Sequence, residues 1–229
     1  MDDLELSITC LQKNPKIPNT YFIQGSCSFS TPLLNSFMNL VTKNVSSVDS
    51  SSHRIFLNAF SVTTLKEFRQ TLTNPNVKYQ KTLDLILSLG QQLEYLIETE
   101  NVSFYEYSPE NVIVIDEKIF VYFSNNVMRV SSSSSSSSGK RTMEFRFPFI
   151  RAPHLLISPE LTKIQSIPCT INHKTIYYSL GLLSTFFLLN ERIEEFHLDE
   201  LNFLKNTKLY WLLLRCLDLD PLKRTIVYL

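Results

Sequence analysis

Glycine is scarce in this chain, which has four glycines in 229 residues, at positions 25, 90, 139 and 181. A loop that covers the phosphates of a nucleotide needs several closely spaced glycines. Its backbone must approach the ligand and adopt conformations that other side chains disfavour. No two glycines here lie close together, so the sequence excludes a glycine-rich phosphate loop.

The chain also lacks an excess of charge of either sign. Lys and Arg number 22, as do Asp and Glu, so the formal net charge is zero. Proteins that bind nucleic acid usually carry a basic excess, because each phosphate contact is an ion pair formed by displacing counterions. We therefore expect no nucleic-acid partner.

Close cysteine pairs and long apolar runs are missing as well. Cysteines 10, 27, 169 and 216 are too scattered for a metal or redox motif, and we expect them to be reduced. The longest apolar stretch, Ile176–Leu189, is shorter than the roughly 20 residues that cross a bilayer. The acidic start lacks the order of a secretory signal. We expect a cytoplasmic or nuclear protein without a membrane span, not a secreted one.

The residues that are present have the balance of a globular domain, with 44% hydrophobic and 19% charged. Apolar periodicity and turn residues predict the elements of the first part of the chain. These are strands over Leu4–Cys10, Thr20–Ile23 and Arg54–Phe60, a helix over Thr31–Lys43, and a polar loop over Ser46–Ser52.

The second part of the chain is predicted to be mainly helical around one hairpin. Helices are expected over Ser61–Leu72, Val77–Glu100, Ile176–Leu189 and Lys208–Leu217, and the hairpin strands over Val112–Ile115 and Ile119–Phe123. The eight serines of Ser131–Ser138 predict a flexible loop. The order of elements predicts an α+β fold.

Between the longest predicted helix and the hairpin lies the sequence FYEYSPEN, residues 104–111. In this position it resembles the catalytic loop of eukaryotic protein kinases, H-R-D-L-x-P-E-N. The resemblance puts Glu106 at the catalytic Asp and Asn111 at the metal-binding Asn. Taken alone, Ser108–Asn111 is also a plain turn, with Pro109 fixing φ.

Further motifs follow in the order of the kinase family. The place of the metal-binding Asp of D-F-G, 13 residues after Asn111, is Ser124. Residues 157–160, ISPE, resemble A-P-E, and YYSLG at 177–181 resembles the W-S-L-G helix. CLDLDPLKRT, at 216–225, resembles the end of the large lobe and puts Arg224 in place to pair with Glu160.

The resemblance implies a two-lobe protein-kinase-like fold, with a reduced β-rich small lobe over residues 1–60 and a mainly helical large lobe over residues 61–229. It also implies weakened chemistry, because Ser124 offers no carboxylate to a hard dication. Between Glu5 and Asp49 there is no acidic residue that could orient a phosphate-binding lysine. Glu106 keeps a carboxylate at the base position.

From these residues we expect a catalytically inactive kinase-like protein, a pseudokinase, without a cofactor or metal. It would act as a scaffold, decoy or regulator by binding another protein, for example a kinase or a kinase substrate. One alternative is a weak Ser/Thr kinase that uses Glu106 as base, with ATP and Mg²⁺ bound weakly. Another is a structural or assembly protein, for instance of a large DNA virus, where a location in the virion would apply.

Overall fold

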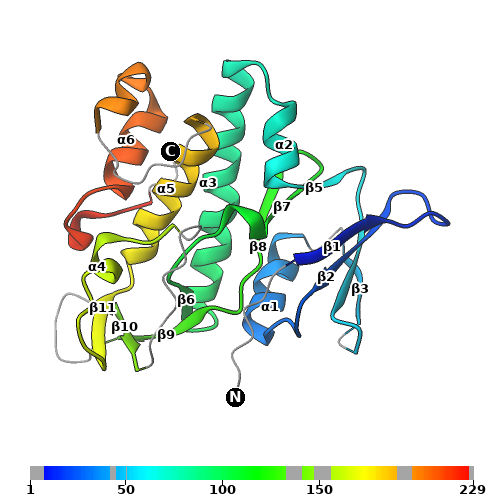
Figure 1. Cartoon of the computed structure of the whole chain (residues 1–229), viewed down its shortest axis with the longest axis horizontal. Helices are drawn as coiled ribbons and strands as arrows, with labels where there is room; N and C mark the ends of the chain where they lie inside the picture. Colours follow the sequence, from blue (N-terminus) through cyan, green and yellow to red (C-terminus); the bar gives the residue numbers. More distant parts are fainter. Residues whose placement is uncertain are drawn as a thin grey trace. The chain divides into compact units, whose positions relative to one another are not determined.

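The structure of the chain is a computed structural model that describes residues 8–41, 45–49, 51–132, 141–146, 156–189 and 198–226 (Figure 1). The chain divides into two compact units, one of residues 1–102 and 108–127 and the other of residues 103–107 and 128–229. Helices and strands occur in both units, which confirms the predicted α+β class. The two-lobe kinase fold and its boundary at residue 60 stay predictions.

The first unit begins with a four-stranded antiparallel sheet in the order β1-β2-β4-β3. Its strands are β1 (Ile8–Lys13), β2 (Thr20–Gly25), β3 (Val45–Asp49) and β4 (Arg54–Asn58). Ile23 of β2 pairs with Ile55 of β4, and both side chains are fully buried. Such apolar cross-strand pairs stabilise a sheet through side-chain packing on its covered face.

Two predictions for this sheet need correction. The polar loop expected over Ser46–Ser52 is wrong, because β3 occupies Val45–Asp49. Among the described residues this strand pairs only with β4 and lies at the edge of the sheet. Polar side chains can face solvent there, so the usual apolar signal is absent. The first strand continues to Lys13, beyond its predicted end, while residues 1–7 lie outside the described residues.

Helices and a small second sheet complete the first unit. The helices are α1 (Thr31–Leu40), α2 (Leu65–Thr71) and α3 (Pro75–Glu98), and the sheet has the order β5-β7-β8, with β5 (Val62–Thr64), β7 (Val112–Ile115) and β8 (Ile119–Tyr122). Helix α3 packs against both α1 and β8. The predicted hairpin and the long helix are confirmed to within two residues at each end.

The helix expected over Ser61–Leu72 starts later than predicted, because β5 pairs with β7 first. Thr64 is the last residue of β5 and also the N-cap of α2. Its hydroxyl accepts a hydrogen bond from the Glu67 N–H at 3.2 Å, and the Glu67 carboxylate accepts one from the Thr64 N–H at 2.9 Å. This reciprocal capping box satisfies N–H groups that the first turn of a helix leaves unpaired.

A buried amide joins α3 to the hairpin. The Gln92 side chain accepts a hydrogen bond from the Tyr122 N–H at 3.0 Å and donates one to the Tyr122 carbonyl at 2.9 Å. It also donates to the Ser36 hydroxyl on α1 at 3.3 Å. Gln92 therefore satisfies the backbone of β8 much as a neighbouring strand would.

The second unit contains a sheet in the order β11-β10-β9-β6. Its strands are β6 (Val102–Phe104), β9 (Val127–Ser132), β10 (Arg141–Phe145) and β11 (Cys169–Asn172). Ser131 and Ser132 pair with β10, so the predicted flexible serine loop is wrong for these two residues. Strand pairing satisfies their backbone although their side chains contribute little packing. Serines 133–138 lie outside the described residues.

Helix α5 (Thr175–Leu189) is buried along most of its length in the second unit and confirms the predicted apolar helix. The unit also contains α4 (Pro159–Thr162), α6 (Lys208–Cys216) and the 3-10 helices η2 (Leu198–Leu204) and η3 (Pro221–Lys223). Helix α6 packs on α5 next to Gly181, where a Cβ atom would come within 2.9 Å of the Leu217 side chain. Across the described ranges, no helix has the length and apolarity to span a membrane.

Candidate functional site

The turn at Ser108–Asn111 has the predicted compact shape. Pro109–Asn111 form a 3-10 turn, η1, in which the Asn111 N–H donates to the Ser108 carbonyl at 3.1 Å. The Ser108 N–H donates to the buried Tyr122 hydroxyl at 3.2 Å. Pro109 presets φ for the first turn residue, and β7 follows at once. The turn therefore fixes where Asn111 enters the hairpin.

Asn111 is buried at the end of the hairpin. Its carbonyl accepts a hydrogen bond from the Phe123 N–H at 2.9 Å, so Phe123 lies opposite it, next to Ser124. Its side-chain oxygen accepts the N–H of Ile8, the first residue of β1, at 3.4 Å. A contact of this length is weak, but it directs a backbone donor at the atom that the resemblance gives to a metal ion.

Ser124 is also buried and turned toward the backbone. Its hydroxyl accepts a hydrogen bond from the Asn126 N–H at 3.0 Å, which closes a short turn after β8. A neutral hydroxyl in this arrangement adds no charge to the site, whereas Mg²⁺ is usually held through carboxylates and phosphates. The structure thus brings Asn111 and Ser124 to the same end of the hairpin, and both bond to backbone amides.

Asn125 is a residue of this region that the sequence did not single out. Its side-chain oxygen accepts the Ser30 N–H at 2.9 Å, and its amide donates to the Ser28 carbonyl at 2.7 Å. Ser30 is the N-cap residue of α1, so Asn125 holds the segment that leads into this helix. No local sequence pattern predicts such a contact, because the partners lie more than 90 residues apart in sequence.

Glu106 belongs to the other compact unit, in the segment 103–107. Its side chain is buried, and its neighbours are held by packing and backbone bonds. The Tyr105 ring meets the Phe145 ring edge-on with centroids 5.5 Å apart. The N–H and carbonyl of Tyr107 both bond to the backbone of Leu156, at 3.2 and 2.7 Å. The segment is thus built into the second unit on both sides of Glu106.

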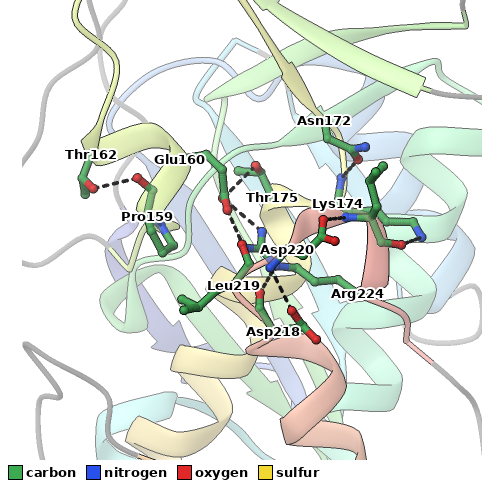
Figure 2. Close-up of polar contacts among 11 residues, drawn as sticks. Pro159, Glu160, Thr162, Asn172, Lys174, Thr175, Asp218, Leu219, Asp220 and Arg224 are labelled. Carbon is green, nitrogen blue, oxygen red and sulfur yellow. Dashed lines mark hydrogen bonds and ion pairs between the residues drawn. The ribbon is translucent and has the colours of Figure 1, made fainter.

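Glu160 and Arg224 meet as a two-pronged ion pair within the second unit (Figure 2). One guanidinium nitrogen lies 3.0 Å from Oε2 of Glu160, and the other lies 2.5 Å from Oε1. The Arg224 Nε donates to the Asp218 carbonyl at 2.6 Å, and the guanidinium carbon lies 4.9 Å from the centroid of the Tyr178 ring. Thr175 adds a hydroxyl contact to Glu160 at 3.3 Å. These bonds join α4, α5 and the segment after α6.

Burial and pairing act in opposite directions on the Glu160 carboxylate. Burial raises its pKa, but hydrogen bonding, chiefly from Arg224, and the charge of Arg224 together outweigh this effect, so the pKa lies below its ordinary value. The Arg224 side chain is fully buried, whereas that of Glu160 is 21% exposed. The pair therefore contributes stability mainly while the carboxylate is ionised.

Possible metal ligands and the Lys13 cation bear on whether the described residues offer a metal or phosphate site. Within them, no cluster of three or more His, Cys, Asp or Glu side chains is arranged to hold a metal ion. Lys13, on the edge strand β1, directs its ammonium over the Tyr21 ring, 5.8 Å from the centroid. No protein-family model matches the chain, and no curated protein sequence matches it.

Proposed function

We propose that this chain is a protein-kinase-like pseudoenzyme that binds another protein as a scaffold, decoy or regulator. The main support for the proposal is the hydrogen bonding of Asn111 and Ser124, the two residues that the resemblance assigns to metal binding. The side-chain oxygens of Asn111 and Ser124 accept backbone N–H groups, and neither position has a carboxylate. Phosphoryl transfer depends on carboxylate-bound Mg²⁺ to position the nucleotide and offset its charge, so its loss removes the main source of catalysis.

The kinase-like fold is part of this proposal, and the arrangement within each unit supports it. The first unit has an antiparallel sheet with one helix, followed by a long helix and a hairpin. The second unit has the Glu160–Arg224 pair, which the resemblance to A-P-E and the large-lobe ending put together. Shared fold does not imply shared activity, so the functional argument rests on the hairpin residues.

Thermal unfolding with ATP and MgCl₂ tests the loss of nucleotide binding. A site with a Kd of about 10 µM would stabilise the protein by about 2.7 kcal/mol in about 1 mM ATP, because only the native state binds. We expect no magnesium-dependent rise in Tm, with EDTA as the matched control. A rise that requires magnesium and disappears in both Glu106→Ala and Asn111→Ala would contradict the proposal and favour a weak kinase.

Protein binding is tested separately by purifying the tagged chain from its natural host and measuring the stoichiometry of any complex. We expect a defined partner in a fixed ratio, which a kinase or kinase substrate would satisfy. A chain that is isolated alone, or that assembles only into a regular lattice with itself, would contradict this role and favour the structural alternative.

A further inference from the structure

Helix α6 carries a stripe of exposed side chains in which one aromatic residue lies between two cations. The helix packs on α5 and η2, and its buried side chains are Leu209, Leu212, Leu213 and Cys216. Lys208, Trp211 and Arg215 are exposed, and 55% of the Trp211 surface is accessible. With about 3.6 residues per turn, these three positions lie within about 60° of one another around the helix. They therefore form one face toward solvent.

Trp211 is the centre of a small apolar patch on this face. The Tyr210 ring meets it edge-on with centroids 5.5 Å apart, and Tyr210 is half-buried. Leu214, three residues further on and a neighbour on the helix surface, is half-buried as well. Lys208 lies one turn before Trp211 and Arg215 one turn after it. An aromatic anchor with a charged rim is typical of protein-binding surfaces, where Trp, Tyr and Arg contribute much of the binding energy.

The charges on this face are all positive. No Asp or Glu occurs between Leu201 and Leu217. Within the described ranges, neither Lys208 nor Arg215 forms an ion pair. Seven helical residues separate these two cations by about 10.5 Å along the axis. An occupant that pairs with both cations therefore has two acidic groups about that far apart, with an apolar side chain between them for Trp211.

An acidic helix of a partner protein meets this requirement. Residues i and i+7 of a helix share one face at the same spacing of about 10.5 Å, whereas strand residues three apart, which have a similar spacing, point to opposite faces. A second copy of the chain does not fit, because pairing α6 with itself would bring Lys208 and Arg215 against like charges. An anionic membrane is disfavoured, because it attracts clusters of about four to eight cations and this stripe has two.

We propose that the exposed stripe of Lys208, Trp211 and Arg215 binds an acidic amphipathic helix of a partner protein. Trp211 packs on apolar side chains of that helix, and the two cations pair with acidic residues seven positions apart. The inference deepens the proposed function, by naming the surface and the chemistry of the partner, and rests on it in one respect, namely that the ligand is a protein.

Selection from a phage-displayed library of helical peptides with one randomised face tests the proposal. Counter-selection uses the double variant Lys208→Glu/Arg215→Glu. Because Lys208 is in the first turn of α6 and Arg215 in the last, the two reversals have opposite effects on the helix dipole, and circular dichroism should show an unchanged fold. We expect selected peptides to carry acids at i and i+7 with an apolar residue between them. Their affinity should fall at least about tenfold in the double variant and about thirtyfold in Trp211→Ala.

Tryptophan fluorescence gives a second measurement, because Trp211 is the only tryptophan in the chain. A selected peptide should shift its emission to shorter wavelength as the ring leaves water. Replacing the two acids of that peptide with lysine should abolish binding to the unchanged chain and restore binding to the double variant. Peptides that bind both forms of the chain equally, or that leave the emission of Trp211 unchanged, would overturn the proposal.

The same fluorescence signal distinguishes other ligands of this face. Phosphatidylserine vesicles that shift the emission of the unchanged chain, but not that of the double variant, would overturn the proposal in favour of a membrane surface. Poly(U) RNA with that effect would overturn it in favour of a nucleic-acid surface. A dimer that dissociates in Trp211→Ala would overturn it in favour of pairing between two copies.

The two proposals can fail separately. Magnesium-dependent ATP binding would contradict the proposal of an inactive kinase-like protein and would leave the peptide result unchanged. A library without binders that depend on Lys208 and Arg215 would overturn the proposal for α6, while the nucleotide result and any partner bound elsewhere would stand.

Discussion

Replacing Arg224 with alanine would remove a buried cation that connects several parts of the second unit. The guanidinium bonds to both oxygens of Glu160, donates to the Asp218 carbonyl and lies over the Tyr178 ring. Alanine would leave the carboxylate without its cation and the Asp218 carbonyl without its donor. It would also leave a cavity, because the Arg224 side chain is fully buried.

The structure sets the size of the expected effect. Removing one partner of a fully buried pair costs roughly 3 to 5 kcal/mol. Because 21% of the Glu160 side chain is exposed, water can reach its carboxylate, and we expect the lower end, about 3 kcal/mol. In a chain of this size each kcal/mol moves Tm by about 2 to 4 °C, so Arg224→Ala should lower Tm by about 6 to 12 °C.

Thermal unfolding followed by circular dichroism gives this measurement. Arg224→Lys is the matched control, because it keeps the charge but cannot make the two-pronged contact, and its loss should be smaller. A Tm of Arg224→Ala within about 1 °C of the unchanged chain would refute the assignment of a stabilising pair.

The pH dependence of the same difference checks its electrostatic part. The pKa of Glu160 is below its ordinary value of 4.5, so the unfolded state binds the proton more readily. The contribution of the pair is therefore present above pH 4.5 and is lost as the pH falls through the folded pKa. The Tm difference between the unchanged chain and Arg224→Ala should shrink below that pH. If this Tm difference did not change with pH, the loss of stability in Arg224→Ala would be due to packing and not to the ion pair.

Three further substitutions or reactions test other parts of the fold. Gln92→Ala should lower the free energy of unfolding, measured by chemical denaturation, by about 2 to 4 kcal/mol, because it leaves an N–H and a carbonyl of β8 unpaired. The matched control is Gln91→Ala on the exposed side of the same helix, which should change this free energy by less than about 0.5 kcal/mol. Gly181→Ala should cost about 1 to 3 kcal/mol, since its Cβ would crowd Leu217; a gain in stability would mean that α6 shifts freely. Burial raises the pKa of Cys216 to about 12 against the lowering charge of a nearby arginine, so iodoacetamide at pH 8 should spare this thiol in the native protein, as mass spectrometry of the labelled cysteines would show.

Strong periodic signals made much of the fold predictable. The long helix was expected over Val77–Glu100 and occupies Pro75–Glu98, because its apolar residues recur over many turns. The hairpin and α5 were predictable for similar reasons. Strands β3 and β5 were not, because one is a polar edge strand and the other has three residues, too few to establish a period of two.

The candidate site shows a different limit of sequence reasoning. The turn at Ser108–Asn111 was predictable from Pro109, whose fixed φ acts locally. The contacts of Asn111 with Ile8 and of Asn125 with Ser30 join residues about 100 positions apart. The sequence does not show which distant N–H group an asparagine side chain will accept, so these hydrogen bonds could be identified only from the folded structure.

The hydrogen bonds accepted by the polar side chains at this end of the hairpin bear on whether it could bind a metal ion. A ligand site keeps polar atoms available at its surface, and the cost of leaving them unpaired is offset when the ligand arrives. At this hairpin, Asn111, Ser124 and Asn125 instead accept hydrogen bonds from backbone amides of β1, the turn after β8 and the start of α1. A cation that took the oxygens of Asn111 and Ser124 would have to break two of these bonds without gaining a carboxylate. The residues that the resemblance assigns to a metal thus bond to the surrounding backbone instead.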